Sequence, residues 1–203
     1  MTRMRKLFLV AAAFVAAVTA IGAPTASAAP AFSIAPDTVA RQALSPNVTQ
    51  GPYSIVDLNS KKCLLVQGAA ERSPATQFQC VTSYDDQRWW LDYIGTNNTG
   101  DYWHIRNVKS NMCLVVQGQD ERTQAISTQC DTPDNRFIDQ MFYRLRIVDG
   151  NNAFVGYAFV DYNSGKCLVA QGSDDGSPVF QTQCLDSNGN WIGHIDAIWE
   201  LGN

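Results

Sequence analysis

Large apolar side chains alternate with polar ones in three similar stretches of the chain. In each stretch two apolar residues stand two positions apart, and an acid or amide that starts a turn follows two positions later. The apolar pairs are Tyr53 and Ile55, Trp103 and Ile105, and Tyr157 and Phe159, and the turn residues are Asp57, Asn107 and Asp161. Such alternation, ending in turn residues, is typical of half-buried β-strands. The chain shows no sustained helical periodicity, so the pattern predicts an all-β protein.

Each alternating stretch leads into the same cysteine-centred segment. The first cysteine is followed by leucine and, four and five positions on, by glutamine and glycine; these cysteines are Cys63, Cys113 and Cys167. A second cysteine, preceded by glutamine, stands 17 positions later, and these are Cys80, Cys130 and Cys184. A last apolar stretch places an aromatic residue three positions after an aspartate, at Trp89, Phe142 and Trp199.

This repetition predicts three units of four short strands, about twelve strands in all. One unit cannot bury its own apolar face, whereas three units packed around an axis close a barrel without open edges. The units run over about residues 51–100, 101–152 and 153–203. Because identical units should make identical bridges, the repeats predict three disulfides within the units. These are Cys63–Cys80, Cys113–Cys130 and Cys167–Cys184.

The N-terminal segment predicts export. Residues 1–28 combine a basic start, a long apolar run and a small-residue ending, Ala26-Ser27-Ala28, which together are typical of a cleavable secretory signal peptide. An even number of cysteines in an exported chain favours disulfides. Residues 29–50 are rich in proline and poorly patterned, so we expect a linker or an N-terminal extension draped over the domain. The mature protein is thus expected to be secreted and extracellular.

The charge balance argues against two classes of partner. The chain has 15 basic and 19 acidic residues, and loss of the signal, which holds Arg3, Arg5 and Lys6, would leave 12 against 19. Nucleic acids and anionic membrane surfaces are bound by clustered Lys and Arg. Neither is therefore an expected partner.

The residue types needed for metal binding and catalysis are sparse. Paired cysteines 17 positions apart match no zinc spacing, and only His104 and His194 add imidazoles. His104 is expected to be exposed, on the strand face opposite its apolar neighbours. No nucleophile–base set or phosphate-binding glycine loop stands out. We expect no metal, no cofactor and no enzymatic activity.

The units resemble the repeats of the ricin B-type lectin family. In the first unit the matching segments are Cys63-Leu64, Val66, Gly68, Phe78, Cys80 and the Q-x-W motif Gln87-Arg88-Trp89. The second unit fits the same frame, while the third keeps only the aromatic residue of the Q-x-W motif. The resemblance spans residues 51–203 and implies a β-trefoil fold whose partner is a carbohydrate or glycoconjugate.

The resemblance also implies where a sugar would bind. The family's site uses an aspartate two positions after the first cysteine, an aromatic ring two positions before the second, and a polar pair before the Q-x-W aromatic. The ring is Phe78 in the first unit, and the polar pairs are Asp86-Gln87 and Asp139-Gln140 in the first and second. The departures are Leu65, Val115 and Val169 at the aspartate position, Thr128 and Thr182 at the ring position, and Ala197 after Asp196. The first unit is therefore the expected site.

A glutamine four positions after each first cysteine offers a replacement for the missing aspartate. These residues are Gln67, Gln117 and Gln171. An amide can both donate to and accept from a sugar hydroxyl. The alternative is that each amide bonds the backbone of the adjacent glycine turn, which would explain its presence in all three units.

The sequence thus predicts a secreted, non-enzymatic protein that binds carbohydrate weakly at up to three shallow sites. The alternative partner is an extracellular protein, as for a protease inhibitor. The apolar residues Leu65, Val115 and Val169 favour that alternative. A third alternative is a secreted scaffold that retains no ligand.

Overall fold

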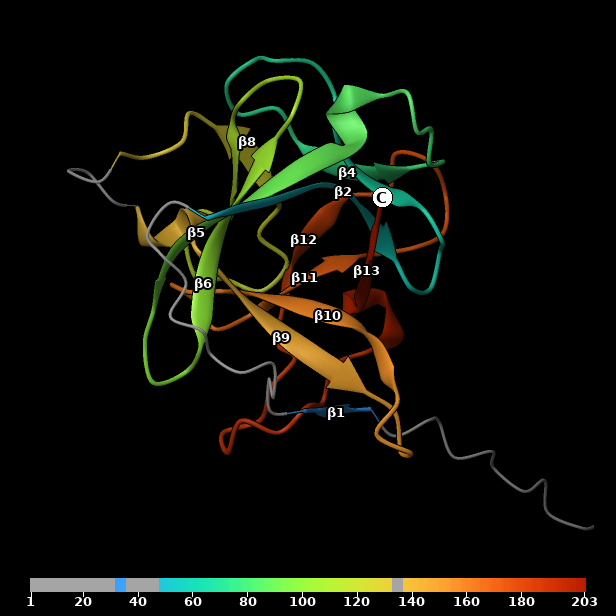
Figure 1. The fold of residues 1–203 in the computed structure, drawn as a ribbon, viewed down its shortest axis with the longest axis vertical. Helices are drawn as coiled ribbons and strands as arrows, with labels where there is room; N and C mark the ends of the chain where they lie inside the picture. Colours follow the sequence, from blue (N-terminus) through green and yellow to red (C-terminus); the bar gives the residue numbers. More distant parts are fainter. Residues whose placement is uncertain (1–31, 36–47, 133–136) are drawn as a thin grey trace, which may run out of the picture.

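Six antiparallel strands close into a barrel (Figure 1). The structure is a computed structural model that describes residues 32–35, 48–132 and 137–203. The barrel strands are β2 (Thr49–Asp57), β5 (Arg88–Thr96), β6 (Asp101–Asn107), β9 (Phe142–Val148), β10 (Phe154–Asp161) and β13 (Trp199–Gly202). The ring closes because β6 pairs with β9, and β13 pairs with both β10 and β2.

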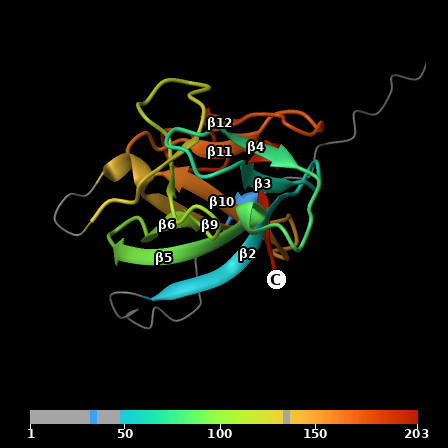
Figure 2. The ribbon, with the colours of Figure 1, turned by 90° about the horizontal axis from the view of Figure 1, so that it is seen from above.

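Three hairpins cover one end of the barrel, one from each unit. They are formed by β3 (Cys63–Val66) with β4 (Ala75–Phe78), β7 (Cys113–Val115) with β8 (Ile126–Thr128), and β11 (Cys167–Ala170) with β12 (Val179–Thr182). Figure 2 shows β3, β4, β11 and β12 on one side of the barrel strands β2 and β5. Each unit supplies two barrel strands and one hairpin, so the predicted twelve-strand, three-unit β-trefoil is confirmed.

A thirteenth strand lies within the segment predicted to be a linker. Strand β1 (Ser33–Ile34) pairs with β9, with Ser33 opposite Val148 and Ile34 opposite Ile147. This part of the N-terminal extension therefore packs along the barrel. The first barrel strand begins at Thr49, two residues before the expected start of the domain. The predicted signal peptide, residues 1–28, lies outside the described residues.

The core of the barrel repeats with the units. Residues at three equivalent sets of positions are buried: Ile55, Ile105 and Phe159; Leu64, Leu114 and Leu168; and Trp89, Phe142 and Trp199. Burying one such side chain contributes roughly 1.5–3 kcal/mol relative to leaving it exposed. Both tryptophans also donate an indole N–H to a backbone carbonyl of their own unit, Leu64 or Leu168, at 3.0 Å. The alternating residues of the sequence thus form one core.

The disulfides follow the predicted pairing. Each joins the start of a hairpin to the segment just after it: Cys63–Cys80, Cys113–Cys130 and Cys167–Cys184. All six cysteines are used. The bridges hold the loop that follows each hairpin against the hairpin itself.

The prediction that His104 is exposed is wrong. Its side chain is buried, and its Nε2 lies 3.1 Å from Oδ1 of Asp131. Asp131, which follows Cys130, packs against His104 on the face of β6 opposite Trp103 and Ile105. The alternation of apolar and polar residues in β6 could not predict this contact, because Asp131 lies outside the strand.

Candidate functional site

A short 3-10 turn beside each hairpin carries the polar pair of the expected sugar site. The turns are η1 (Asp85–Gln87), η2 (Ile138–Gln140) and η3 (Ile195–Ala197). In the first unit the Gln87 amide donates to the carbonyl of Gln79 at 2.9 Å and accepts from the N–H of Val81 at 2.7 Å. The turn is thereby fixed to the backbone on both sides of Cys80. Asp86 directly precedes Gln87 in the sequence, and Phe78 directly precedes Gln79.

The expectation that Gln87 and Gln140 contact the sugar is corrected by their burial. Gln87 is 1% exposed, and its donor and acceptor are both used by the backbone. Gln140 is 2% exposed and makes the equivalent bonds to Gln129 and Asp131, at 2.9 Å each. The two amides position the neighbouring aspartates. Ala197 cannot make these bonds in the third unit.

The first unit presents a ring and a carboxylate at its surface. Phe78, at the end of β4, is 39% exposed. Oδ2 of Asp86 lies 3.2 Å from Nζ of Lys109, while its buried Oδ1 has no hydrogen-bond partner among the described residues. Asp86 and Lys109 line an open depression of about 320 Å³, with the exposed ring of Tyr84 on its wall. The Asp86 carboxylate is an acceptor for hydroxyl groups, and the exposed rings of this unit are Tyr84, on the wall of the depression, and Phe78, outside it.

In the second unit Asp139 sits on its turn without a ring at the neighbouring strand end, where Thr128 stands. Burial raises the pKa of the Asp139 carboxyl above its ordinary value. Thr128 accepts a hydrogen bond from the Gln140 amide at 2.8 Å. Asp139 and Gln140, which the sequence predicted as a second sugar site, thus lie together, but no aromatic ring lies beside them on which a sugar could stack.

The third unit contains a cavity that the sequence did not predict. About 350 Å³ opens at the positions equivalent to the expected sugar site, because Thr182 and Ala197 are small. Its lining includes Asp196, whose buried Oδ1 has no hydrogen-bond partner in the described part of the chain. Burial raises the pKa of Asp196, although nearby His194 opposes the shift. Phe180 lies two residues before Thr182 on the same strand face and lines this cavity with an aromatic ring. Comparing the unit with the family's repeat position by position did not reveal this ring.

The residues at the family's aspartate position do not form an apolar surface. Leu65, Val115 and Val169 are all buried. They therefore give no support to the alternative of an extracellular protein partner. Val169 nevertheless lines the cavity of the third unit.

The glutamines that follow the first strand of each hairpin do not bond their glycine turns. Oε1 of Gln117 accepts from Nη1 of Arg72 at 2.9 Å, and Oε1 of Gln171 accepts from Nη2 of Arg122 at 2.6 Å. Each arginine belongs to the preceding unit. Gln67 is exposed and has no such partner in the described residues. Of the three glutamines, Gln67 alone thus keeps its amide oxygen without a partner among the described residues.

The described residues show neither a metal site nor a membrane-spanning helix. Within them, no group of three or more His, Cys, Asp or Glu side chains is placed to hold a metal ion. No helix in the same ranges has the length and hydrophobicity to cross a membrane. Each depression is lined by two carboxylates with basic neighbours: Asp85 and Asp86 with Lys109 in the first unit, and Glu121 and Asp196 with Arg122 and His194 in the third.

The chain belongs to the ricin-type β-trefoil lectin domain-like family. The family's sequence model matches residues 40–129 and 93–182, which together span more than half of the chain. Some of the structural neighbours of this fold are lectins. The ricin B-like β-trefoil lectin fold supports carbohydrate binding at the level of the family.

Several solved structures share the fold. The designed threefold-symmetric protein ThreeFoil superposes with a TM-score of 0.58 and 21% identity, covering 74% of this chain and 97% of that one. The Rhizoctonia solani agglutinin gives 0.55 and 14%, covering 78% and 96%. The Macrolepiota procera ricin B-like lectin, solved in complex with lactose, gives 0.54 and 16%, covering 79% and 98%. No curated protein sequence matches the chain.

Proposed function

We propose that this chain is an exported, non-enzymatic lectin that binds a neutral carbohydrate through its first unit. The observations that carry the proposal are the exposed ring of Phe78 at the end of β4 and the Asp86 carboxylate on η1, two segments that the buried amide of Gln87 ties together through its bonds on both sides of Cys80. A pyranose ring has an apolar C–H face and a rim of hydroxyls. Phe78 suits the face, and Oδ2 of Asp86, which also lies 3.2 Å from Nζ of Lys109, suits a hydroxyl donor.

Gln67 lies at the other end of the same hairpin, because Phe78 is opposite Cys63, and it would contact a more distant part of a bound glycan. It follows β3, which pairs with β4, so it lies on the hairpin that carries Phe78. Its exposed amide can donate and accept at once. Binding at such a shallow surface should be weak, in the range of about 0.1–1 mM for a single unit.

The covalent structure supports the export part of the proposal. Three disulfides consume every cysteine, and such bonds persist in oxidising compartments. Together with the basic and apolar start of the sequence, this favours a protein that works outside the cell.

Replacing Phe78 with alanine is expected to weaken carbohydrate binding several-fold, since loss of a stacking ring costs on the order of 1 kcal/mol or more. A glycan array with residues 29–203 identifies the saccharide, and calorimetric titration compares the variants with the native protein. Asp86→Ala should weaken binding similarly, and Phe78→Tyr should retain it.

Two matched variants make the result specific. Phe154 is another exposed ring, on β10, and Phe154→Ala should leave the affinity unchanged. Thr182→Ala tests the equivalent position in the third unit and should also have little effect. Native affinity in Phe78→Ala would contradict the first-unit site, and an array without any bound glycan would contradict the lectin function.

A further inference from the structure

Each unit sends a loop to the hairpin of the next unit, and its tip occupies the same place in all three. The tip residues, nine positions after each first cysteine, are Arg72, Arg122 and Gly176. Their backbone N–H groups donate to equivalent carbonyls of the next unit: Ser127 at 2.8 Å, Gln181 at 2.9 Å and Gln77 at 2.8 Å. The residue at this position is therefore fixed against the neighbouring hairpin whichever side chain it carries.

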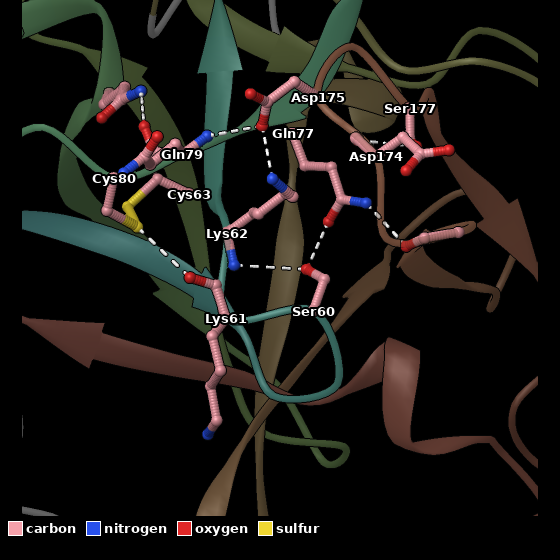
Figure 3. Close-up of polar contacts among 12 residues, drawn as sticks. Ser60, Lys61, Lys62, Cys63, Gln77, Gln79, Cys80, Asp174, Asp175 and Ser177 are labelled. Atoms are coloured by element: carbon pink, nitrogen blue, oxygen red, sulfur yellow. Dashed lines mark hydrogen bonds and ion pairs between the residues drawn. A yellow bond between two sulfur atoms is a disulfide. The ribbon is translucent and has the colours of Figure 1, made fainter.

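An acidic residue beside the tip strengthens this docking. Glu71, Glu121 and Asp175 accept hydrogen bonds from the backbone N–H of Gln129, Gln183 and Gln79, respectively. Figure 3 shows the contact of the third unit with the first, where Asp175 meets Gln79 and Lys62 beside the Cys63–Cys80 bridge. In the same view Gln77 bonds Ser60 and the neighbouring loop.

The two arginines cover the site positions of the unit that they reach. Arg72 bonds Gln117 of the second unit, and Arg122 bonds Gln171 of the third. The Arg122 guanidinium also lies over the Phe180 ring, 4.6 Å from its centroid, and that ring is only 5% exposed. A ring whose face is occupied by a guanidinium cannot stack on a sugar.

Gly176 leaves the first unit uncovered. It has no side chain to reach Gln67 or Thr76, the residue equivalent to Phe180, and Phe78, two positions further along the same strand, is 39% exposed. The backbone does not require glycine here. Arg72 and Arg122 adopt φ values of 64° and 63°, close to the 82° of Gly176, and a Cβ on Gly176 would meet nothing within 4 Å.

We propose that the tip residue is a latch that decides which unit can bind carbohydrate. Arginine from the preceding unit covers the second and third units, and glycine leaves the first unit open; the second unit, which has no ring, gains no site when its arginine is removed. The proposal rests on the proposed function of the first unit. It adds that the third unit, with its cavity, the Phe180 ring and Asp196, is a complete but closed site.

The test exchanges the latches between units. The native protein, Gly176→Arg, Arg122→Gly and Arg72→Gly are titrated calorimetrically with lactose, galactose, N-acetylglucosamine and mannose. Gly176→Arg should weaken binding by about tenfold or more, and Arg122→Gly should raise the stoichiometry from one site to two. Arg72→Gly should change nothing, because the second unit has no ring beneath the latch. Gly176→Ala, which introduces a Cβ without a guanidinium, should bind like the native protein.

The outcomes separate the two proposals. Native binding that is unaffected by Gly176→Arg, with one site in Arg122→Gly, would overturn the latch and leave the lectin function intact. A native protein that binds none of the four saccharides would contradict the proposed function. In that case Arg122→Gly alone tests the latch. Saccharide binding gained by this variant would support the latch, and no binding by this variant would overturn it. Unfolding curves of each variant confirm that the compared proteins are folded.

Discussion

Replacing Asp161 with asparagine is expected to stabilise the protein by on the order of 3 kcal/mol at pH 8 and to change little at pH 4. Asp161 is fully buried, and burial raises the pKa of its carboxyl to about 7. That value lies above the ordinary 3.8, so the stability conferred by the protonated group is complete below about pH 4 and is lost as the pH rises through 7. Asparagine removes the charge that is costly at high pH.

The equivalent residue of the second unit shows that asparagine fits. Asn107 caps its turn by accepting the N–H of Ser110 at 3.1 Å, as Asp161 accepts that of Ser164 at 2.7 Å. The Nδ2 of Asn107 then donates to the carbonyl of Asp86 at 3.0 Å. Oδ2 of Asp161 is buried without a partner among the described residues. At the Oδ2 position a carboxylate has no proton to donate, whereas an amide or a protonated carboxylic acid can donate a hydrogen bond.

Urea unfolding at a series of pH values measures the effect. Burial also raises the pKa of Asp57 to about 6, so Asp57→Asn should act in the same direction with a smaller gain. Asn107→Asp is the matched reverse change, and it should destabilise the protein at pH 8 more than at pH 4. A stability difference between Asp161→Asn and the native protein that is independent of pH would refute the argument.

Truncating Trp199 to alanine should cost roughly 3–5 kcal/mol, because the side chain is fully buried in the barrel. That is a large part of the total stability of a typical domain, about 5–15 kcal/mol. The indole also donates to the carbonyl of Leu168 at 3.0 Å, which would be left without its donor. Denaturant midpoints followed by circular dichroism give the loss.

Trp199→Phe separates packing from the hydrogen bond. The second unit has Phe142 at this position, so the barrel accepts a phenyl ring there. The phenylalanine variant should lose about 1–3 kcal/mol, the cost of a smaller ring and an unpaired buried carbonyl. Equal losses in Trp199→Phe and Trp199→Ala would show that ring volume contributes little at this position.

The repeats carried most of the fold information. The recurrence of cysteines, apolar pairs and turn residues was sufficient to predict the three units, the strand count and the bridges, because local periodicity and covalent spacing are properties of the sequence itself. Strand β1 could not be predicted from the sequence, because two residues in a proline-rich segment give no periodic pattern. Its position depends on an edge offered by β9.

The site was less predictable, because the same residue types serve different purposes in it. An amide such as Gln87 has the same sequence signature whether it meets a sugar or the backbone, and only its burial separates the two. The contacts of Arg72 and Arg122 join residues 45 and 49 positions apart and cross from one unit to the next. Comparing each unit with the family, one at a time, cannot show contacts that cross from one unit to the next.

The pairing of β13 with both β2 and β10 gives the end of the chain a particular role in folding. Trp199 lies opposite Asp57 of the first barrel strand, so the seam joins the earliest and latest parts of the barrel. A growing chain that has not yet released Trp199–Gly202 leaves the edges of β2 and β10 without this partner, and unpaired edges promote association between chains. Long-range closure of this kind also slows folding. The risk of aggregation should therefore be greatest while the chain is being made and should fall once its last strand is in place.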